Sequence, residues 1–247
     1  MATGQRYSSG GMGTLSGSAR AGTGRAVRAG NNMTQAVEVL VFDLGGVLVD
    51  WNGVDPLIEL TALNRLSREA ARQFWMHTPW VAELDSGRCT PEQFATAMTE
   101  ELELGLSASE MTRLLGEWVQ GPYPGVKPLL QQLKARYRLA VLSNNNALHW
   151  EKIGRDMVWD ELFDATFASH LLGLRKPDAA IYQHVQQQLA VSPSHIVFFD
   201  DNIECVEAAR RVGWQAFHTK GIAELTQVLH RQGWLAPDLA DTTAAVR

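Results

Sequence analysis

Residues 39–50 read VLVFDLGGVLVD, an apolar run that leads to Asp43 and then to a pair of glycines. An uninterrupted apolar run is typical of a strand buried on both faces, where a carboxylate is costly to place. An aspartate at the end of a strand can simply cap the next helix or begin a turn. The stretch leaves that alternative open, so the reason for the carboxylate must come from the rest of the chain.

Three further apolar runs share this character, and helical segments separate them. They are YRLAVLSN at 137–144, HIVFFDD at 195–201 and WQAFHT at 214–219. Strands of this kind are covered by helices on both faces, and the helices between them provide the crossovers of a parallel sheet. The sequence therefore predicts an α/β fold with a doubly wound, Rossmann-type parallel sheet.

The segment between the first two predicted strands is far longer than one crossover needs and contains no convincing strand. Thr90 to Gln93 form a capping box, and Ser107 to Glu110 form another, each ahead of an apolar-periodic helix. We therefore predict a small helical cap at 52–122, inserted into a core domain formed by 34–51 and 123–235.

The two ends of the chain differ from this body. Residues 1–33 are rich in Gly, Ser and Arg and lack apolar periodicity, so we expect them to be disordered. Residues 236–247 have little to bury and are expected to form a flexible tail.

Composition and charge exclude several classes of function. Residues 1–33 carry four of the 22 basic groups and no acid, which leaves 18 basic against 27 acidic groups, a net charge of −9, in the rest of the chain. That balance argues against a nucleic-acid partner. No apolar stretch reaches the ~18 residues needed to span a bilayer, and the two distant cysteines, Cys89 and Cys205, indicate no disulfide framework. We expect a cytoplasmic protein without membrane partners, and the sequence does not predict its oligomeric state.

Polar residues stand where three of the four predicted strands end. Ligands of an open α/β sheet bind at the carboxyl ends of its strands, so these side chains are expected to converge. Each alone can be a cap or turn former, but together with a lysine in GLRKPDAAIY they predict one site. The residues are Asp43, Ser143, Asn144, Lys176, Asp200 and Asp201.

Three aspartates gathered at one end of a sheet raise each other's pKa values unless a cation lies between them. Mg²⁺ prefers oxygen ligands and meets that need. None of the seven histidines has the spacing of a competing metal motif. Ser143, Lys176 and the amides around Gly45 and Gly46 would supply donors for an anion beside the metal, most simply a phosphoryl group. The expected partner is thus a small phosphorylated molecule.

Four motifs occur in order along the chain: VFDLGGVLVD, VLSNNN, GLRKPDAAIYQHV and VFFDDN. Together, over about 37–230, they resemble the four motifs of the haloacid dehalogenase-like (HAD) hydrolases, including a helical cap after the first. Within that superfamily, DLGGVLVD, LRKPDAAIYQHV and FFDDN look most like the bacterial α-D-glucose-1-phosphate phosphatase group.

The resemblance implies roles for the candidate residues. Asp43 would be the nucleophile that forms an aspartyl-phosphate, while Ser143 and Lys176 would hold the phosphoryl oxygens and Asn144 would shape the phosphate-binding loop. The implied Mg²⁺ ligands are Asp43, the backbone carbonyl of Gly45, Asp201 and, directly or through its neighbours, Asp200.

One departure from the family pattern concerns the residue two positions after the nucleophile. Most family phosphatases carry a general acid there, and this chain has Gly45. Asp50 is a possible substitute, although an anchoring role at the hinge into the cap is the preferred interpretation. Without the acid, an easily departing alcohol is favoured, which predicts a hexose 1-phosphate over the matching 6-phosphate.

The same departure keeps a rival function open, namely a phosphate-binding or regulatory protein that has lost turnover. A 2-haloacid dehalogenase would not need Asp200 and Asp201 as ligands, and a phosphomutase would need the missing acid. Elsewhere, the cap tryptophans are expected in the core, and His149 is expected to be structural rather than to touch substrate. These tryptophans are Trp75, Trp80 and Trp118.

Overall fold

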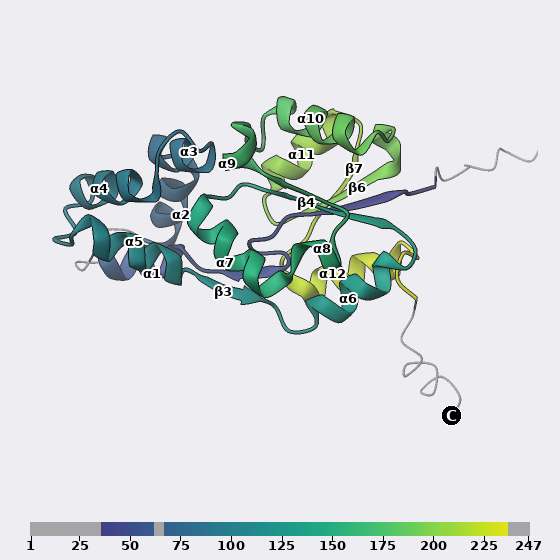
Figure 1. The fold of residues 1–247 in the computed structure, drawn as a ribbon, viewed down its shortest axis with the longest axis horizontal. Coiled ribbons are helices and arrows are strands. Elements are labelled where there is room, and N and C mark those ends of the chain that lie inside the picture. The colour runs from purple at the N-terminus through teal and green to yellow at the C-terminus, as the bar shows by residue number, and fades with distance from the viewer. Residues whose placement is uncertain (1–35, 62–66, 237–247) are drawn as a thin grey trace, which may run out of the picture. The chain divides into compact units, whose positions relative to one another are not determined.

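A five-stranded parallel sheet runs through the computed structural model, which describes residues 36–61 and 67–236 (Figure 1). The strand order is β5-β4-β1-β6-β7, and every neighbouring pair is parallel. The α/β prediction is confirmed. The segment 1–33, predicted to be disordered, and all but the first residue of the predicted flexible tail 236–247 lie outside the described residues. The strands are β1 (Val39–Phe42), β4 (Arg138–Ser143), β5 (Ala165–Ala168), β6 (Ile196–Asp200) and β7 (Gln215–His218).

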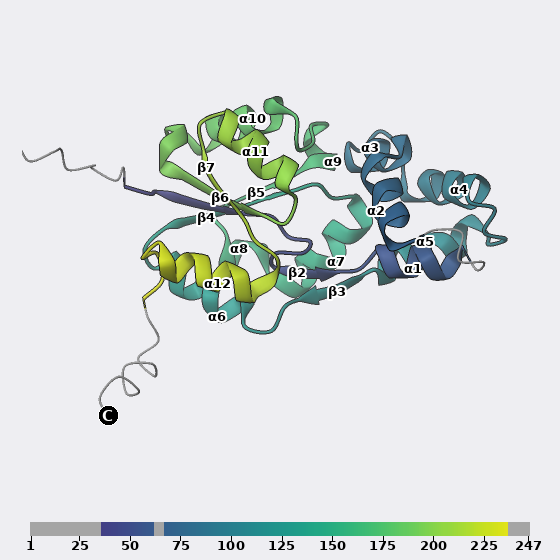
Figure 2. The same cartoon turned by 180° about the vertical axis from the view of Figure 1, so that it is seen from behind.

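Helices cover both faces of this sheet, as the views from front and back show (Figures 1 and 2). Alternate residues of β1 point to opposite faces: Leu40 and Phe42 belong to one apolar cluster, and Val39 and Val41 belong to the other. The first cluster includes α6 (Val126–Lys134), α7 (Ala147–Met157), α8 (Trp159–Leu162) and α12 (Gly221–Arg231); the second includes α10 (Ala179–Leu189) and α11 (Ile203–Arg211).

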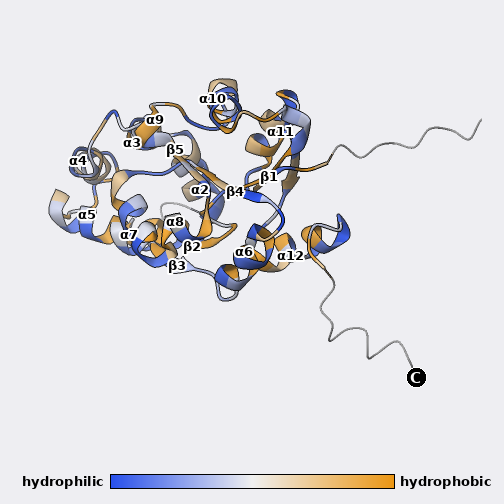
Figure 3. Cartoon of the chain, turned by 45° about the vertical axis from the view of Figure 1, so that its right-hand side comes forward, coloured by the Kyte–Doolittle hydropathy of each residue, from blue (hydrophilic) through white to orange (hydrophobic). Residues whose placement is uncertain are grey.

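Both faces of the central strand are therefore dry, which explains why its sequence is apolar without alternation. Hydropathy colouring places the strands among the apolar parts of the fold and many polar residues on the outer sides of the helices (Figure 3). Two short elements complete the core, the helix α9 (Ser169–Leu172) and the 3₁₀ turn Pro193–His195. Within the described residues, no helix has the length and apolar character to cross a membrane.

The segment between β1 and β4 is mainly helical, but a short strand lies before the inserted helices and another after them, and the two strands form one antiparallel pair. The expectation of no strand in this segment was wrong, because β2 (Val49–Trp51) pairs with β3 (Val119–Pro122). Between them lie α1 (Val54–Leu60), α2 (Arg68–His77), α3 (Pro79–Asp85), α4 (Pro91–Glu101) and α5 (Ala108–Glu117). The limits 52–122 for a cap domain stay a prediction.

Both predicted capping boxes are confirmed, at the first turns of α4 and α5. The inserted helices share a separate apolar cluster that contains Phe94 and the buried Trp118. Trp75 packs on both rings, with centroids 5.9 and 5.2 Å away. Trp80 is 39% exposed, so its assignment to the core was wrong. It lies on the outer side of α3, where proline at the first helical position, not packing, fixes the helix start.

Candidate active site

The carboxyl ends of three adjacent strands bring the candidate residues together. Asp43 directly follows β1, and its N–H continues the ladder by donating to the Phe199 carbonyl at 2.9 Å. Ser143 and Asp200 are the last residues of β4 and β6, the strands on either side of β1. The chain leaves β1 first toward β4 and later returns to β6. The site therefore lies at the switch point of the sheet, where the predicted convergence is observed.

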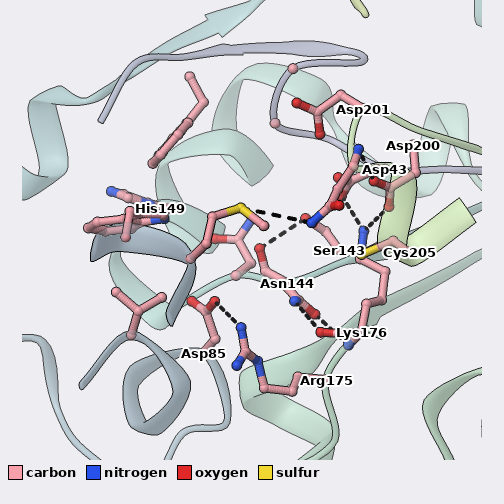
Figure 4. Close-up of a pocket in the computed structure, with 18 of the residues that line it drawn as sticks. Asp43, Asp85, Ser143, Asn144, His149, Arg175, Lys176, Asp200, Asp201 and Cys205 are labelled. Atoms are coloured by element: carbon pink, nitrogen blue, oxygen red, sulfur yellow. Dashed lines mark hydrogen bonds and ion pairs between the residues drawn. The ribbon is translucent and has the colours of Figure 1, made fainter. Parts of the chain in front are cut away.

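Lys176 lies at the centre of this group, with 2% of its surface exposed (Figure 4). Its Nζ is 3.0 Å from Asp43 Oδ1 and 2.6 Å from Asp200 Oδ2. Burial alone would lower the pKa of Lys176, but the two carboxylates outweigh it and hold the pKa well above the ordinary value. The ammonium group therefore stays protonated and offers positive charge at the end of β1.

Asn144 positions this lysine through two hydrogen bonds to its backbone. Asn144 Nδ2 donates to the Lys176 carbonyl at 2.9 Å, and the Lys176 N–H donates to Asn144 Oδ1 at 2.8 Å. The carboxamide is thus committed to shaping the loop. Ser143 is also buried, but its hydroxyl has only a long 3.4 Å contact with the Asn144 carbonyl, so it is available to donate to an anion.

Asp43, Asp200 and Asp201 offer oxygen atoms that all lie within 4.8 Å of one another. Burial raises the pKa of Asp43 to about 6 against the opposing effect of Lys176. Burial and the charge of Asp43 raise the pKa of Asp201 to about 6 as well. These raised values show that the cluster favours added positive charge, and its all-oxygen donors fit Mg²⁺.

The three aspartates differ in how many partners they already have. Asp200 accepts from Lys176 Nζ through Oδ2 and from the Asn202 N–H through Oδ1, at 2.7 Å. Both of its oxygens are therefore engaged, which fits a residue that holds Lys176. Asp43 and Asp201 keep more of their oxygen lone pairs free for a cation.

Gly45 and Gly46, in the loop after Asp43, differ in whether the structure requires a glycine. Gly46 has φ +73°, and a Cβ there would lie 2.6 Å from Asp201 Oδ2, so only glycine lets this carboxylate approach the loop. At Gly45, which lines the chamber, a Cβ would make an ordinary 3.5 Å contact with Trp51 Cβ. Space therefore does not forbid a side chain at position 45.

A chamber of about 530 Å³ opens above these residues and extends to the inserted helices. His149 lines it, but both ring nitrogens are occupied: Nε2 is 2.7 Å from the Leu115 carbonyl and Nδ1 is 3.0 Å from Asn146 Nδ2. Burial lowers the pKa of His149 to about 4, so the ring is neutral, with Nε2 as donor and Nδ1 as acceptor. The expectation of a structural histidine is confirmed.

Four charged residues that line the chamber were not expected from the sequence: Arg72, Asp85, Arg175 and Glu204. Asp85, at the end of α3, is buried, and its Oδ2 lies 4.0 Å from the guanidinium of Arg175 (Figure 4). Burial raises the pKa of Asp85 to about 7 despite Arg175. Arg175 could have been noticed as the neighbour of Lys176, whereas nothing in the local sequence marks Asp85. Asp50, the suggested substitute acid, is exposed and does not line this chamber.

Neither cysteine forms a disulfide. Cys89 is half-buried, while Cys205 is buried beside the carboxylates, and burial raises its pKa well above the ordinary thiol value. A protonated, buried thiol is unreactive, so the surroundings of Cys205 fit a structural role.

Known proteins resemble this chain in sequence and fold. A family model for haloacid dehalogenase-like hydrolases matches residues 37–213. The sesquiterpene phosphatase astK of Aspergillus oryzae is 30% identical over 192 residues, 75% of this chain and 91% of its own length. Phosphatase MT3486 of Mycobacterium tuberculosis is 30% identical over 189 residues, 74% and 87% of the two chains.

A solved structure has a similar fold. The HAD family enzyme bt-2542 of Bacteroides thetaiotaomicron, in complex with magnesium and inorganic phosphate, superposes with a TM-score of 0.63 at 21% identity. The match covers 75% of this chain and 95% of that one. At this identity the likeness supports the fold, which agrees with the parallel sheet described above.

Proposed function

The chain belongs to the haloacid dehalogenase-like hydrolases, and from that premise we propose that it is a Mg²⁺-dependent phosphatase of small phosphomonoesters. The observation that carries the proposal is the buried Lys176 ammonium between Asp43 and Asp200, with Asp201 beside them. Such a site combines a nucleophilic carboxylate with fixed positive charge, which phosphoryl transfer requires. Two relatives that bear the name phosphatase support the same reaction.

In the proposed reaction, a carboxylate oxygen of Asp43 attacks phosphorus, and the bond from phosphorus to the ester oxygen breaks. The product alcohol leaves with a proton from solvent or a nearby group, and water then hydrolyses the aspartyl-phosphate to phosphate. Lys176 and the Ser143 hydroxyl bind the phosphoryl oxygens and neutralise their charge. Asn144 keeps Lys176 in place through the two backbone hydrogen bonds described above.

The residues that would hold Mg²⁺ are Asp43, Asp201 and the backbone carbonyl of Gly45. When bound, the ion would neutralise charge on the carboxylates and the phosphoryl group. Asp200, whose oxygens are engaged by Lys176 and the Asn202 amide, acts mainly by fixing the lysine. The magnesium and phosphate bound by bt-2542, which has a similar fold, support the presence of Mg²⁺ in the proposed reaction.

The finer substrate prediction, a hexose 1-phosphate, rests on Gly45. No side chain at that position can protonate the departing oxygen, which favours esters of more acidic alcohols. The alternative function, phosphate binding without turnover, rests on the same glycine.

Phosphate release tests the proposal. We expect steady release in Mg²⁺ that scales with enzyme and is abolished by EDTA. Asp43→Asn should lower kcat by several powers of ten, because removing a covalent nucleophile usually costs that much. Asp50→Asn, which changes an exposed carboxylate outside the chamber, is the matched control. Retention of more than about a tenth of kcat in Asp43→Asn would contradict the nucleophile assignment, and release of halide from a 2-haloacid instead of phosphate would identify a dehalogenase.

A further inference from the structure

The part of the chamber away from the carboxylates has an apolar wall. It is formed by the antiparallel pair of β2 and β3 (the β2–β3 stem), the inserted helices and one side of α7. Trp51, Val54 and Trp75 are only half-buried, and the two tryptophan rings meet with their centroids 5.3 Å apart. Half-buried aromatic and aliphatic groups facing a cavity are an unfilled apolar surface. The main lining residues are Trp51, Val54, Trp75, Val81, Val119 and Ile153.

Polar side chains also line the chamber, but their hydrogen-bonding groups are largely used within the protein. The Asn144 carboxamide holds the Lys176 backbone, and the Asn145 Oδ1 accepts from the Asn146 N–H at 2.9 Å. Asn146 and His149 are bonded to each other at two points, and the second nitrogen of His149 is bonded to a backbone carbonyl. The ring nitrogens of His149 and the carboxamide oxygens of the three asparagines are thus engaged, which leaves mainly amide N–H donors, such as those of Asn145 Nδ2, for substrate hydroxyls.

The charged groups that remain are few. Asp85 and Arg175 face the chamber as a pair, Arg72 and His77 are exposed on α2, and Glu204 is exposed on α11. A bound sugar would bring several hydroxyl groups into a chamber with this small number of free partners. A buried hydroxyl without a hydrogen bond is costly, whereas a hydrocarbon gains from the same wall.

We infer that the organic part of the substrate is a hydrocarbon group, so that the natural substrate is an alkyl, branched aliphatic or aromatic phosphomonoester rather than a sugar phosphate. This inference rests on the proposed phosphatase activity and names its substrate class. It departs from the hexose 1-phosphate expected from leaving-group chemistry, because that expectation considers only the oxygen at the scissile bond. The wall contacts the rest of the substrate.

A series of linear alkyl monophosphates from ethyl to octyl separates the two effects. Every member releases a primary alcohol, so the leaving group barely changes while the apolar surface grows. A fully buried methylene increases binding by a factor of about four. We therefore expect kcat/KM to rise at least about tenfold from butyl to octyl phosphate, even with incomplete burial. Octyl phosphate should also exceed a hexose 6-phosphate, another ester of a primary alcohol, by at least about tenfold.

A substitution in the wall ties this dependence to the chamber. Val54→Thr adds a hydroxyl with almost no change of shape, and we expect it to lower the octyl-to-ethyl ratio of kcat/KM about two- to fivefold. Val37→Thr is the control, because Val37 lies just before β1, at the end of the strand away from Asp43, and does not line the chamber. This variant should keep the wild-type ratio. Calorimetry with Asp43→Asn should show tighter binding of octyl than ethyl phosphate, with a more negative heat-capacity change.

The outcomes separate the two proposals. A hexose phosphate cleaved as efficiently as octyl phosphate, or a flat alkyl series, overturns the inference while the phosphatase activity stands. Release from no ester at all overturns the proposed function, and calorimetry with the wild type then decides the inference. Equal affinity for ethyl and octyl phosphate in that measurement overturns it as well.

Discussion

Replacing Asp85 by asparagine should stabilise the protein at neutral pH and leave its stability at low pH almost unchanged. Asp85 is 8% exposed, and burial raises the pKa of its carboxyl group from 3.8 to about 7, even though Arg175 and Lys176 oppose the shift. A group with a raised pKa contributes its full stability below the unfolded value. That contribution is lost as the pH rises through the folded value. The carboxamide introduced by Asp85→Asn would be neutral throughout and would avoid this loss.

The size of the effect follows from the shift. Between the two pKa values, about 3 units apart, each pH unit costs about 1.4 kcal/mol, which gives an upper limit of about 4 kcal/mol. Over the practical range from pH 5 to pH 7, the limit is about 2.7 kcal/mol. Water that enters a locally opened chamber would reduce it, so we expect a relative gain of about 1.5–2.5 kcal/mol for Asp85→Asn across this range.

Urea unfolding in EDTA at pH 5, 6, 7 and 8 measures this gain directly. Glu101→Gln, which removes an exposed carboxylate from the end of α4, is the control for net charge and should show no such trend. A difference between Asp85→Asn and wild type that stays constant from pH 5 to pH 8 would refute the raised pKa of the buried Asp85.

Three further predictions concern other parts of the site. Gly46→Ala should raise the Mg²⁺ concentration for half-maximal activity at least about tenfold, because a side chain at φ +73° costs about 1–2 kcal/mol and would displace Asp201; an unchanged Mg²⁺ titration would contradict this. His149→Leu should lower the free energy of unfolding by about 2–3 kcal/mol in urea, since its buried partners lose their bonds; a change below about 0.5 kcal/mol would show that these bonds are dispensable. Gly45→Asp, whose Cβ would have room, should raise kcat for a hexose 6-phosphate more than for the 1-phosphate; an equal effect on both would show that leaving-group protonation is not limiting.

The central strands could be predicted from the sequence because their surroundings are the same on both faces. β1, β4 and β6 each have a continuous apolar run, and a polar residue ends or directly follows each strand. Both the sheet and the convergence of Asp43, Ser143 and Asp200 therefore follow from local pattern. β5 was missed because it is a four-residue edge strand in which only two residues are buried. A pattern that short cannot be told from a loop.

The β2–β3 stem was missed for a different reason. Its strands have three and four residues, and β3 contains Gly121 and Pro122, which local propensity assigns to turns. Their pairing joins segments almost seventy residues apart in sequence, Trp51 opposite Val119. The pair forms only when the chain returns to the core after the inserted helices, and no local sequence pattern predicts that return.

The missed polar contacts have the same origin. Asp85 comes near Arg175 because α3 contacts α9. This contact needs a glycine at position 87, because a Cβ there would lie only 2.3 Å from the His170 carbonyl oxygen. The bonds between Asn144 and the Lys176 backbone likewise join two loops of the core. The residue types alone indicate that these side chains can form hydrogen bonds and ion pairs. Which partners they have depends on tertiary contacts that the local sequence does not show.

The burial of the reactive group links the inserted segment to the chemistry of the sheet. Asp43 is 8% exposed, although it stands at the open edge of the sheet where ligands enter, because residues of the stem and the inserted helices line the same chamber. Exclusion of water raises the pKa of Asp43 and at the same time strengthens its attraction to Lys176 and to any bound cation. An apolar substrate body would deepen this exclusion when it fills the wall, whereas a hydrated one would oppose it. The proposed hydrocarbon specificity and the proposed charge stabilisation therefore both depend on the exclusion of water from this chamber when substrate binds.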